Sequence, residues 1–132
     1  MNERVDTRSG VMPGKYRFTV SAVPEKGSWG NANYYEFKFL VGIGGDRQLY
    51  SERVPVWKCA DLLRALGARE VEAGVFDWDK EAVVGIMFDG EIVMEKNPKD
   101  NKEYRRLSNP VALPNFPKDP SVGAGGSEEV PF

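Results

Sequence analysis

Short segments in which apolar and polar residues alternate, separated by clusters of Gly, Pro and Asn, dominate this chain. Residues 14–22 are the first of them, with Tyr16, Phe18 and Val20 on one side and polar residues between them. A period of two is that of a β-strand with one buried face. Turn residues at such close spacing leave little room for long helices, so we expect a mainly β fold of short strands.

The second predicted strand begins near Tyr34, after a loop over residues 24–33 that contains one Pro, two Gly and two Asn. Apolar residues then occupy every second position, so the predicted core face consists of Tyr35, Phe37, Phe39 and Val41. Tyr34 and Lys38 fall on the opposite face.

The third predicted strand covers residues 47–54, after a glycine-rich turn at residues 42–46. Leu49 and Tyr50 compete for its inward side, so the sequence leaves the buried face open. The turn is similar to a phosphate-binding loop, but a strand follows it and no Gly-Lys-Ser/Thr is present. We therefore interpret it as a hairpin turn.

A single helix is predicted after Pro55, because a missing N–H costs nothing at the first helical position. Apolar residues at spacings of three and four form its buried stripe, which consists of Val56, Cys59, Leu62, Leu63 and Leu66. Gly67 follows as a C-terminal cap. Cys59 has no histidine to activate it, so we interpret it as a small buried residue.

The second half of the chain predicts two more strands. Residues 70–80 are acidic and poorly periodic. Residues 82–94 indicate either one long strand with a bulge at residues 89–90 or a hairpin that turns there. A loop at residues 97–101 leads to a last strand over residues 103–108.

Three strands, a helix and two strands are the order of the OB-fold, a five-stranded Greek-key barrel with the helix between strands three and four. Another small α+β roll is the alternative. A length of 132 residues suits one domain. We place this domain at residues 11–113, between a flexible N-terminus at residues 1–10 and a disordered, Gly- and Pro-rich tail at residues 114–132.

The composition excludes several classes of enzyme. The chain has no His and one Cys, which rules out His-dependent triads, His/Cys zinc sites, CxxC pairs and intramolecular disulfides. Asp77, Asp79 and Glu81 are the carboxylates closest to a nuclease metal site, but they lie in one irregular segment, whereas two-metal sites draw ligands from separate elements. We expect no catalytic residue, metal or cofactor. The chain lacks a signal segment and an apolar run of membrane-spanning length, which predicts a cytoplasmic protein without a membrane partner.

Charge is segregated along the chain although the formal net charge is only −2. Residues 70–91 contain seven acids and one base, whereas residues 15–58 contain seven bases and four acids, and residues 95–106 contain five bases and three acids. In an OB-fold, strands two and three and the loops after strands one and four bind oligonucleotides. The basic segments fall on those elements.

Aromatic residues are interleaved with these bases. Stacking of a nucleobase on an aromatic ring contributes roughly 1–3 kcal/mol, and Lys and Arg neutralise phosphates, which favours single-stranded nucleic acid because its bases are unpaired. The predicted nucleic-acid-binding residues are Lys15, Arg17, Trp29, Tyr34, Lys38, Arg47, Arg53, Lys96, Lys102, Tyr104, Arg105 and Arg106. The alternative is that the rings cover a sheet face and the charges only solubilise it.

The last five residues combine two acids, an aliphatic residue, a proline and a terminal aromatic residue; they are Glu128, Glu129, Val130, Pro131 and Phe132. This pattern resembles the acidic C-terminal tip of bacterial single-stranded DNA-binding proteins, which docks onto replication, recombination and repair enzymes. The resemblance implies that Phe132 fills an apolar pocket while the carboxylates meet basic residues. This tip has fewer acids than the family pattern, and Val where Ile is commoner.

The body carries a second pattern, made of residues 12–16, 26–28, 34–41, 62–67 and Gly85. It resembles a family of phage-encoded proteins associated with replication and recombination genes. The resemblance implies an OB-fold protein of the host cytoplasm that coats single-stranded DNA, recruits host enzymes through its tip and is compatible with homo-oligomers. The rival hypotheses are an OB-like adaptor that binds only proteins and a metal-dependent nuclease that uses Asp77 and Asp79.

Overall fold

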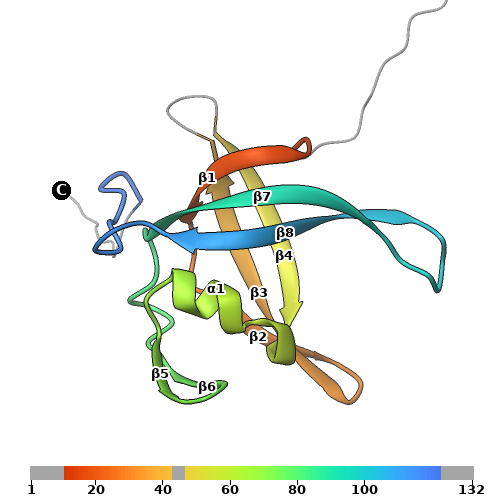
Figure 1. The fold of residues 1–132 in the computed structure, drawn as a ribbon, viewed down its shortest axis with the longest axis horizontal. Coiled ribbons are helices and arrows are strands. Elements are labelled where there is room, and N and C mark those ends of the chain that lie inside the picture. Colours follow the sequence, from red (N-terminus) through yellow and green to blue (C-terminus); the bar gives the residue numbers. More distant parts are fainter. Residues whose placement is uncertain (1–10, 43–46, 123–132) are drawn as a thin grey trace, which may run out of the picture.

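The computed structural model describes residues 11–42 and 47–122, so the predictions for residues 1–10 and for the tip at residues 128–132 lie outside the described residues. The fold is mainly β, with a strongly curled antiparallel sheet of six strands, a separate two-stranded hairpin and a short helix (Figure 1). In chain order the elements are β1 (Gly14–Val20), β2 (Glu25–Trp29), β3 (Ala32–Val41), β4 (Gln48–Pro55), the 3-10 turn η2 (Val56–Lys58), α1 (Ala60–Ala65), β5 (Arg69–Glu72), β6 (Val75–Asp77), β7 (Met87–Lys96) and β8 (Glu103–Ala112).

Strand β3 organises the sheet because it pairs with three strands. β4 follows one of its edges, while β2 and β1 share the other, β2 beside residues 32–36 and β1 beside residues 39–41. Between β1 and β2, the Ser21 amide donates to the Lys38 carbonyl at 2.9 Å, and Pro24 is fully buried. β1 and β2 thus follow one bent path along β3, which curls the sheet.

Strand β7 pairs with the other edge of β1, and β8 pairs with β7. β7 is continuous through residues 89–90, so no hairpin turns there, but the strand begins at Met87 and not at residue 82 as predicted. The pairing is irregular where we expected it, but the additional residue lies in β8: Asp89 faces Val111, whereas Glu91 faces Ser108. Asn109, inside this bulge, has a φ of 51°.

The core is built on phenylalanines from three strands. Phe18 and Phe88 stack with centroids 5.2 Å apart, and Phe39 meets each of them edge-on at 5.6 Å. Phe37 and Val41 are also buried and Tyr35 is half-buried, which confirms the predicted core face of β3. The even spacing of these residues is what allows one sheet to enclose its own core.

The helix is shorter than predicted. Residues 56–58 form the 3-10 turn η2, and α1 begins only at Ala60. Its apolar stripe is confirmed for Leu62, Leu63 and Leu66, which are buried. The prediction was wrong for Val56, which is exposed because the tighter turn rotates it away from the helical stripe. Gly67 has a φ of 79° directly after the helix, as expected of a C-terminal cap.

Cys59 is confirmed as a buried residue, with 1% of its surface exposed. Its thiol donates to the carbonyls of Val54 and Pro55, and burial raises the pKa of this thiol to about 11. The thiol is therefore protonated at neutral pH, and it ties the end of β4 to the start of α1. No helix in the described part of the chain is long and apolar enough to span a membrane.

Two segments predicted as irregular are hairpins. The expected loop at residues 24–33 contains β2, which pairs with β3 through a connection at Gly30, where φ is 57°. The expected acidic loop contains β5 and β6. β2, β5 and β6 are largely exposed, so none of them carries the alternation of apolar residues on which the prediction depended. Conversely, the apolar run before β7 is a buried turn rather than a strand, and Gly85 in it has a φ of 91°.

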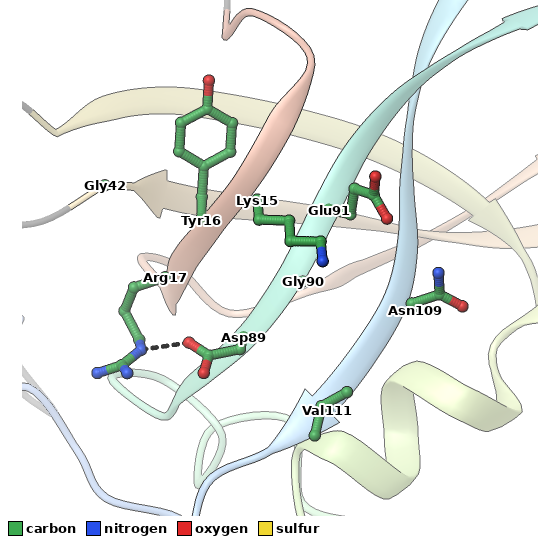
Figure 2. Close-up of a pocket in the computed structure, with 9 residues that line it drawn as sticks. All are labelled: Lys15, Tyr16, Arg17, Gly42, Asp89, Gly90, Glu91, Asn109 and Val111. Atoms are coloured by element: carbon green, nitrogen blue, oxygen red, sulfur yellow. Dashed lines mark hydrogen bonds and ion pairs between the residues drawn. The ribbon is translucent and has the colours of Figure 1, made fainter.

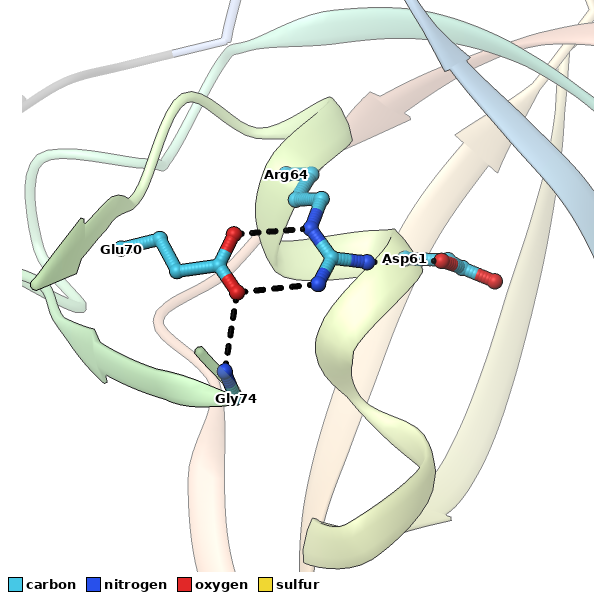
Figure 3. A network of polar contacts seen from close by, with 4 residues as sticks. All are labelled: Asp61, Arg64, Glu70 and Gly74. Atoms are coloured by element: carbon cyan, nitrogen blue, oxygen red, sulfur yellow. Dashed lines mark hydrogen bonds and ion pairs between the residues drawn. The ribbon is translucent and has the colours of Figure 1, made fainter. Parts of the chain in front are cut away.

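The β5–β6 hairpin is fastened to α1 by a carboxylate (Figure 3). Glu70 accepts two hydrogen bonds from Arg64, each 3.0 Å long, and a third from the Gly74 amide at 2.9 Å. The hydrogen bonding from Arg64, followed by that from the Gly74 amide, lowers the pKa of Glu70 to about 2. Arg64 also contacts Asp61 at 3.0 Å, so this arginine forms ion pairs with both Asp61 and Glu70.

The structured body continues beyond residue 113. Lys118 forms a bridge with Ile86, and the Asp119 amide donates to the Gly85 carbonyl at 2.8 Å. The Asp119 carboxylate also pairs with Arg47 at 2.5 Å. Residues 114–122, assigned to the tail from the sequence, thus lie against the barrel.

One side chain joins the two strands at the open side of the sheet. Within the described residues, β4 and β8 share no ladder, but Glu52 of β4 accepts the Leu107 amide of β8 at 2.8 Å and the Tyr50 hydroxyl. Tyr50 is buried while Leu49 is 70% exposed, so the buried face of β4, left open by the sequence, carries Tyr50, Glu52 and Val54. Burial raises the pKa of Glu52.

We predict that Glu52→Ala lowers the free energy of unfolding by about 1–3 kcal/mol, because the Leu107 amide loses its acceptor. Glu52→Gln keeps an acceptor oxygen without a buried charge and should be close to neutral. Urea denaturation followed by tryptophan fluorescence measures both.

The comparison of Glu52→Gln with the wild type also predicts a pH dependence of stability. Because the pKa of Glu52 is raised on folding, the stability due to protonation is fully present below the ordinary value of 4.5 and is lost as pH rises through the folded-state pKa. The stability of Glu52→Gln relative to the wild type should therefore increase as pH rises. A difference that does not change with pH would contradict this account of Glu52.

Candidate nucleic-acid interface

An open groove lies between β4 and β8, where the ladder is missing. It has an upper part of about 620 Å³ and a lower part of about 440 Å³, which share Trp29, Glu52, Arg53 and Arg106. We call it the seam groove. Its upper part also contains Tyr104 and Arg105, and its lower part reaches Pro55 and Lys58.

One wall of the seam groove is aromatic and basic. Trp29, at the end of β2, lies against Tyr34 of β3 with ring centroids 4.4 Å apart. The Arg53 guanidinium lies 5.2 Å from the centroid of Tyr34. Trp29 keeps 44% of its surface exposed, so this cluster offers an aromatic surface beside a cation.

The opposite wall repeats the combination on β8. The Arg106 guanidinium lies 5.8 Å from the ring centroid of Tyr104. The Tyr104 hydroxyl donates to Asp100, which raises the pKa of Tyr104 and lowers that of Asp100. A ring anchored through its hydroxyl has little rotational freedom left to lose when a ligand stacks on it.

Carboxylates accompany the groove arginines. Arg53 lies 3.9 Å from Glu36, and Arg106 lies 3.1 Å from Glu95. All four side chains are partly exposed, and exposed ion pairs contribute only about 0–1 kcal/mol, so a phosphate can replace either acid at small cost.

Arg105 has a different environment from its neighbours. Its guanidinium donates to the Val11 carbonyl at 2.7 Å, and the contact is partly buried. Arg105 therefore fixes the start of the described chain against β8 while adding positive charge to the floor of the seam groove.

Six of the predicted residues gather at the seam groove: Trp29, Tyr34, Arg53, Tyr104, Arg105 and Arg106. Three more flank it. Lys38 pairs in register with Ser51 of the groove, while Lys96 and Lys102 lie at the turn of the β7–β8 hairpin, next to the groove residue Asn97.

The remaining three predicted residues lie elsewhere. Lys15 and Arg17 are on β1, which is two strands away from both β4 and β8 in the sheet order. They line a different, shallow pocket of about 730 Å³, in which Arg17 pairs with Asp89 at 2.5 Å (Figure 2). Arg47 is engaged with Asp119. Lys15 and Arg17 share their pocket with Asp89 and Glu91, so the residues predicted as one basic surface do not all lie on one surface.

The sequence prediction missed the acidic residues of the seam groove, Glu36, Glu52, Asp61 and Glu95, and the basic residue Lys58. A signal existed for Glu52 alone. Once Tyr50 is placed inward, the period of two puts Glu52 on the buried face, where a lone carboxylate requires partners.

Of the carboxylates considered for a nuclease metal site, Asp79 forms a hydrogen bond within its own segment. Asp79 accepts the Glu81 amide at 3.0 Å, which closes a turn after β6. Across residues 11–42 and 47–122, no group of three or more Asp, Glu or Cys side chains is placed to hold a metal ion.

We predict that Gly27→Ala disrupts the Trp29–Tyr34 cluster. Gly27 faces Tyr34 across the β2–β3 ladder, and a Cβ there would overlap the tyrosine ring. The variant should lose the near-ultraviolet circular dichroism of the stacked rings while retaining the far-ultraviolet spectrum. Ser28→Ala, next in the same strand, is the matched control, and an unchanged near-ultraviolet spectrum in Gly27→Ala would refute the packing described.

The seam groove thus unites two ring-and-guanidinium pairs, Trp29–Tyr34 with Arg53 and Tyr104 with Arg106, around one bridging carboxylate. No protein-family model matches this chain, and no curated protein matches it.

Proposed function

We propose that this protein binds single-stranded DNA in the seam groove without sequence preference. The observation that carries the proposal is the presence of Trp29 and Tyr104 in one groove with three arginines, Arg53, Arg105 and Arg106. Aromatic faces accept any base and guanidinium groups accept phosphates, so this set of residues suits a strand whose bases are unpaired. Duplex DNA keeps its bases stacked on each other and cannot use the rings.

The strand connections support an OB-fold as the framework. The bent path of β1 and β2 corresponds to the first OB strand, β3 and β4 to the next two, and β7 and β8 to the last two, with α1 between β4 and β7. The β5–β6 hairpin is an addition to that plan. In an OB-fold the ligand lies over strands two and three and between the adjoining loops. The lining of the seam groove by Glu36 of β3 and residues 49–53 of β4 supports this correspondence.

Binding should depend steeply on salt, because each phosphate that an Arg or Lys neutralises releases a counterion. The ion pairs with Glu36 and Glu95 hold Arg53 and Arg106 at the groove before binding. We infer that phosphates replace these carboxylates, so the free protein can have a net charge near zero and still bind a polyanion.

We predict that Arg53→Ala and Arg106→Ala each weaken binding of a labelled oligo-dT and reduce the slope of log K against log salt by about 0.7, the value for one phosphate contact on a single strand. Both side chains are at least 40% exposed, so the fold should persist. Fluorescence anisotropy at several salt concentrations measures affinity and slope together.

Lys15→Ala is the matched control, because Lys15 is basic but lies in the pocket on β1. An equal loss in Lys15→Ala would move the interface to that pocket. No salt-sensitive binding of oligo-dT by the wild type would overturn the proposed function in favour of a protein adaptor.

A second part of the proposal concerns residues 128–132 and depends on the resemblance to the bacterial tip. We propose that they recruit replication, recombination or repair enzymes of a host cell while the body holds the DNA. Deletion of residues 130–132 should abolish capture of such enzymes from a bacterial lysate and leave oligo-dT affinity at least as high as in the wild type. Unchanged capture by the deletion variant would refute this role.

A further inference from the structure

We propose that Trp57 and Lys58 form an additional subsite for a nucleobase and its phosphate at the lower end of the seam groove. This inference depends on the proposed function, because it assigns a further part of the path of the same single strand. Neither residue belongs to the set that the sequence predicted.

Trp57 is presented to solvent by a turn that is held firmly at both ends. All three side chains of η2 are exposed, and Trp57 has 74% of its surface exposed. The flanking Val54 and Cys59 are buried. The Cys59 amide donates to the Val56 carbonyl at 3.1 Å, and the Cys59 thiol bonds back to the end of β4.

The position of this turn continues the aromatic wall of the groove. Pro55, directly before η2, is the register partner of Tyr34, whose ring lies against Trp29. Pro55 and Lys58 line the lower part of the seam groove together with Trp29 and Arg53. A strand that follows the groove past Trp29 therefore reaches η2 next.

The charges near the turn suit a phosphate. The Lys58 ammonium lies 5.1 Å from the ring centroid of Trp57, so a cation accompanies this ring as guanidinium groups accompany Tyr34 and Tyr104. The acids of the lower groove are Glu52, Asp61 and Glu95. Asp61 lies 3.0 Å from Arg64, which offsets its charge. The arrangement repeats, for a third time, a ring beside a basic side chain.

Packing within the fold does not explain why position 57 is a tryptophan. A side chain with three quarters of its surface in water buries little apolar area, so its truncation should cost the fold little. Tryptophan is enriched among the residues that dominate binding free energy, because it offers a large rigid surface at low entropic cost.

The test compares two ligands of equal length, oligo-dT and an oligonucleotide of abasic deoxyribose phosphates. Trp57→Ala should weaken oligo-dT binding by at least about fivefold, the lower end for one lost base stack, and leave binding of the abasic strand unchanged. Trp57→Phe should recover most of the loss. Lys58→Ala should weaken binding of both ligands and lower the salt slope.

Val111→Ala, which removes another exposed apolar side chain away from the seam groove, is the control. Wild-type affinity of Trp57→Ala for oligo-dT, with Arg53→Ala still impaired, would eliminate the subsite and leave the proposed function intact. Equal losses on both ligands would also overturn it, because stacking requires a base. Absence of wild-type binding to oligo-dT would overturn the proposed function and this inference together.

Discussion

The carboxylate of Glu52 holds together two strand edges that no backbone ladder joins. A ladder between β4 and β8 would close the barrel fully but leave no opening between them. A side-chain bridge to the Leu107 amide keeps the strands in place and leaves space above and below it. The same contact therefore joins the two strands and leaves the groove open, and the raised pKa of Glu52 reflects its desolvation by burial there.

The acids of this protein have two different roles. Glu70 pairs with Arg64 and fastens a hairpin to the helix, and Asp61, at the lower end of the groove, pairs with the same arginine. Glu36 and Glu95 instead lie beside exposed groove arginines. Ion pairs of the second kind are weak in water, so they orient the cations without competing strongly with a phosphate. A net charge of −2 is thus compatible with a local surface for polyanions.

The sequence predicted a strand correctly when one face of that strand is buried. The alternation in β1 and β3 identified Phe18, Phe37 and Phe39 correctly because one face of these strands is dry. β2 and β5 were missed because both of their faces are largely exposed, so only pairing with a neighbour reveals them. The sequence indicated which types of residue line the groove but not which of them lie together. Arg53 and Arg106 are distant in sequence and line one groove only because the sheet curls.

Local contacts within the protein restrain the residues that are proposed to contact DNA. Tyr34 lies over the bare backbone of Gly27, Tyr104 is hydrogen-bonded to Asp100, and the turn of Trp57 is anchored by Cys59. The rings of Tyr34 and Tyr104 are thus restrained by local contacts that need no ligand, whereas for Trp57 the backbone of the turn is restrained. Because immobilising a side chain costs roughly 0.5–1.5 kcal/mol on binding, rings restrained beforehand retain more of their stacking energy as affinity. If Trp57 binds a base as proposed, the lone cysteine contributes without reacting, because its thiol holds the turn that presents this tryptophan.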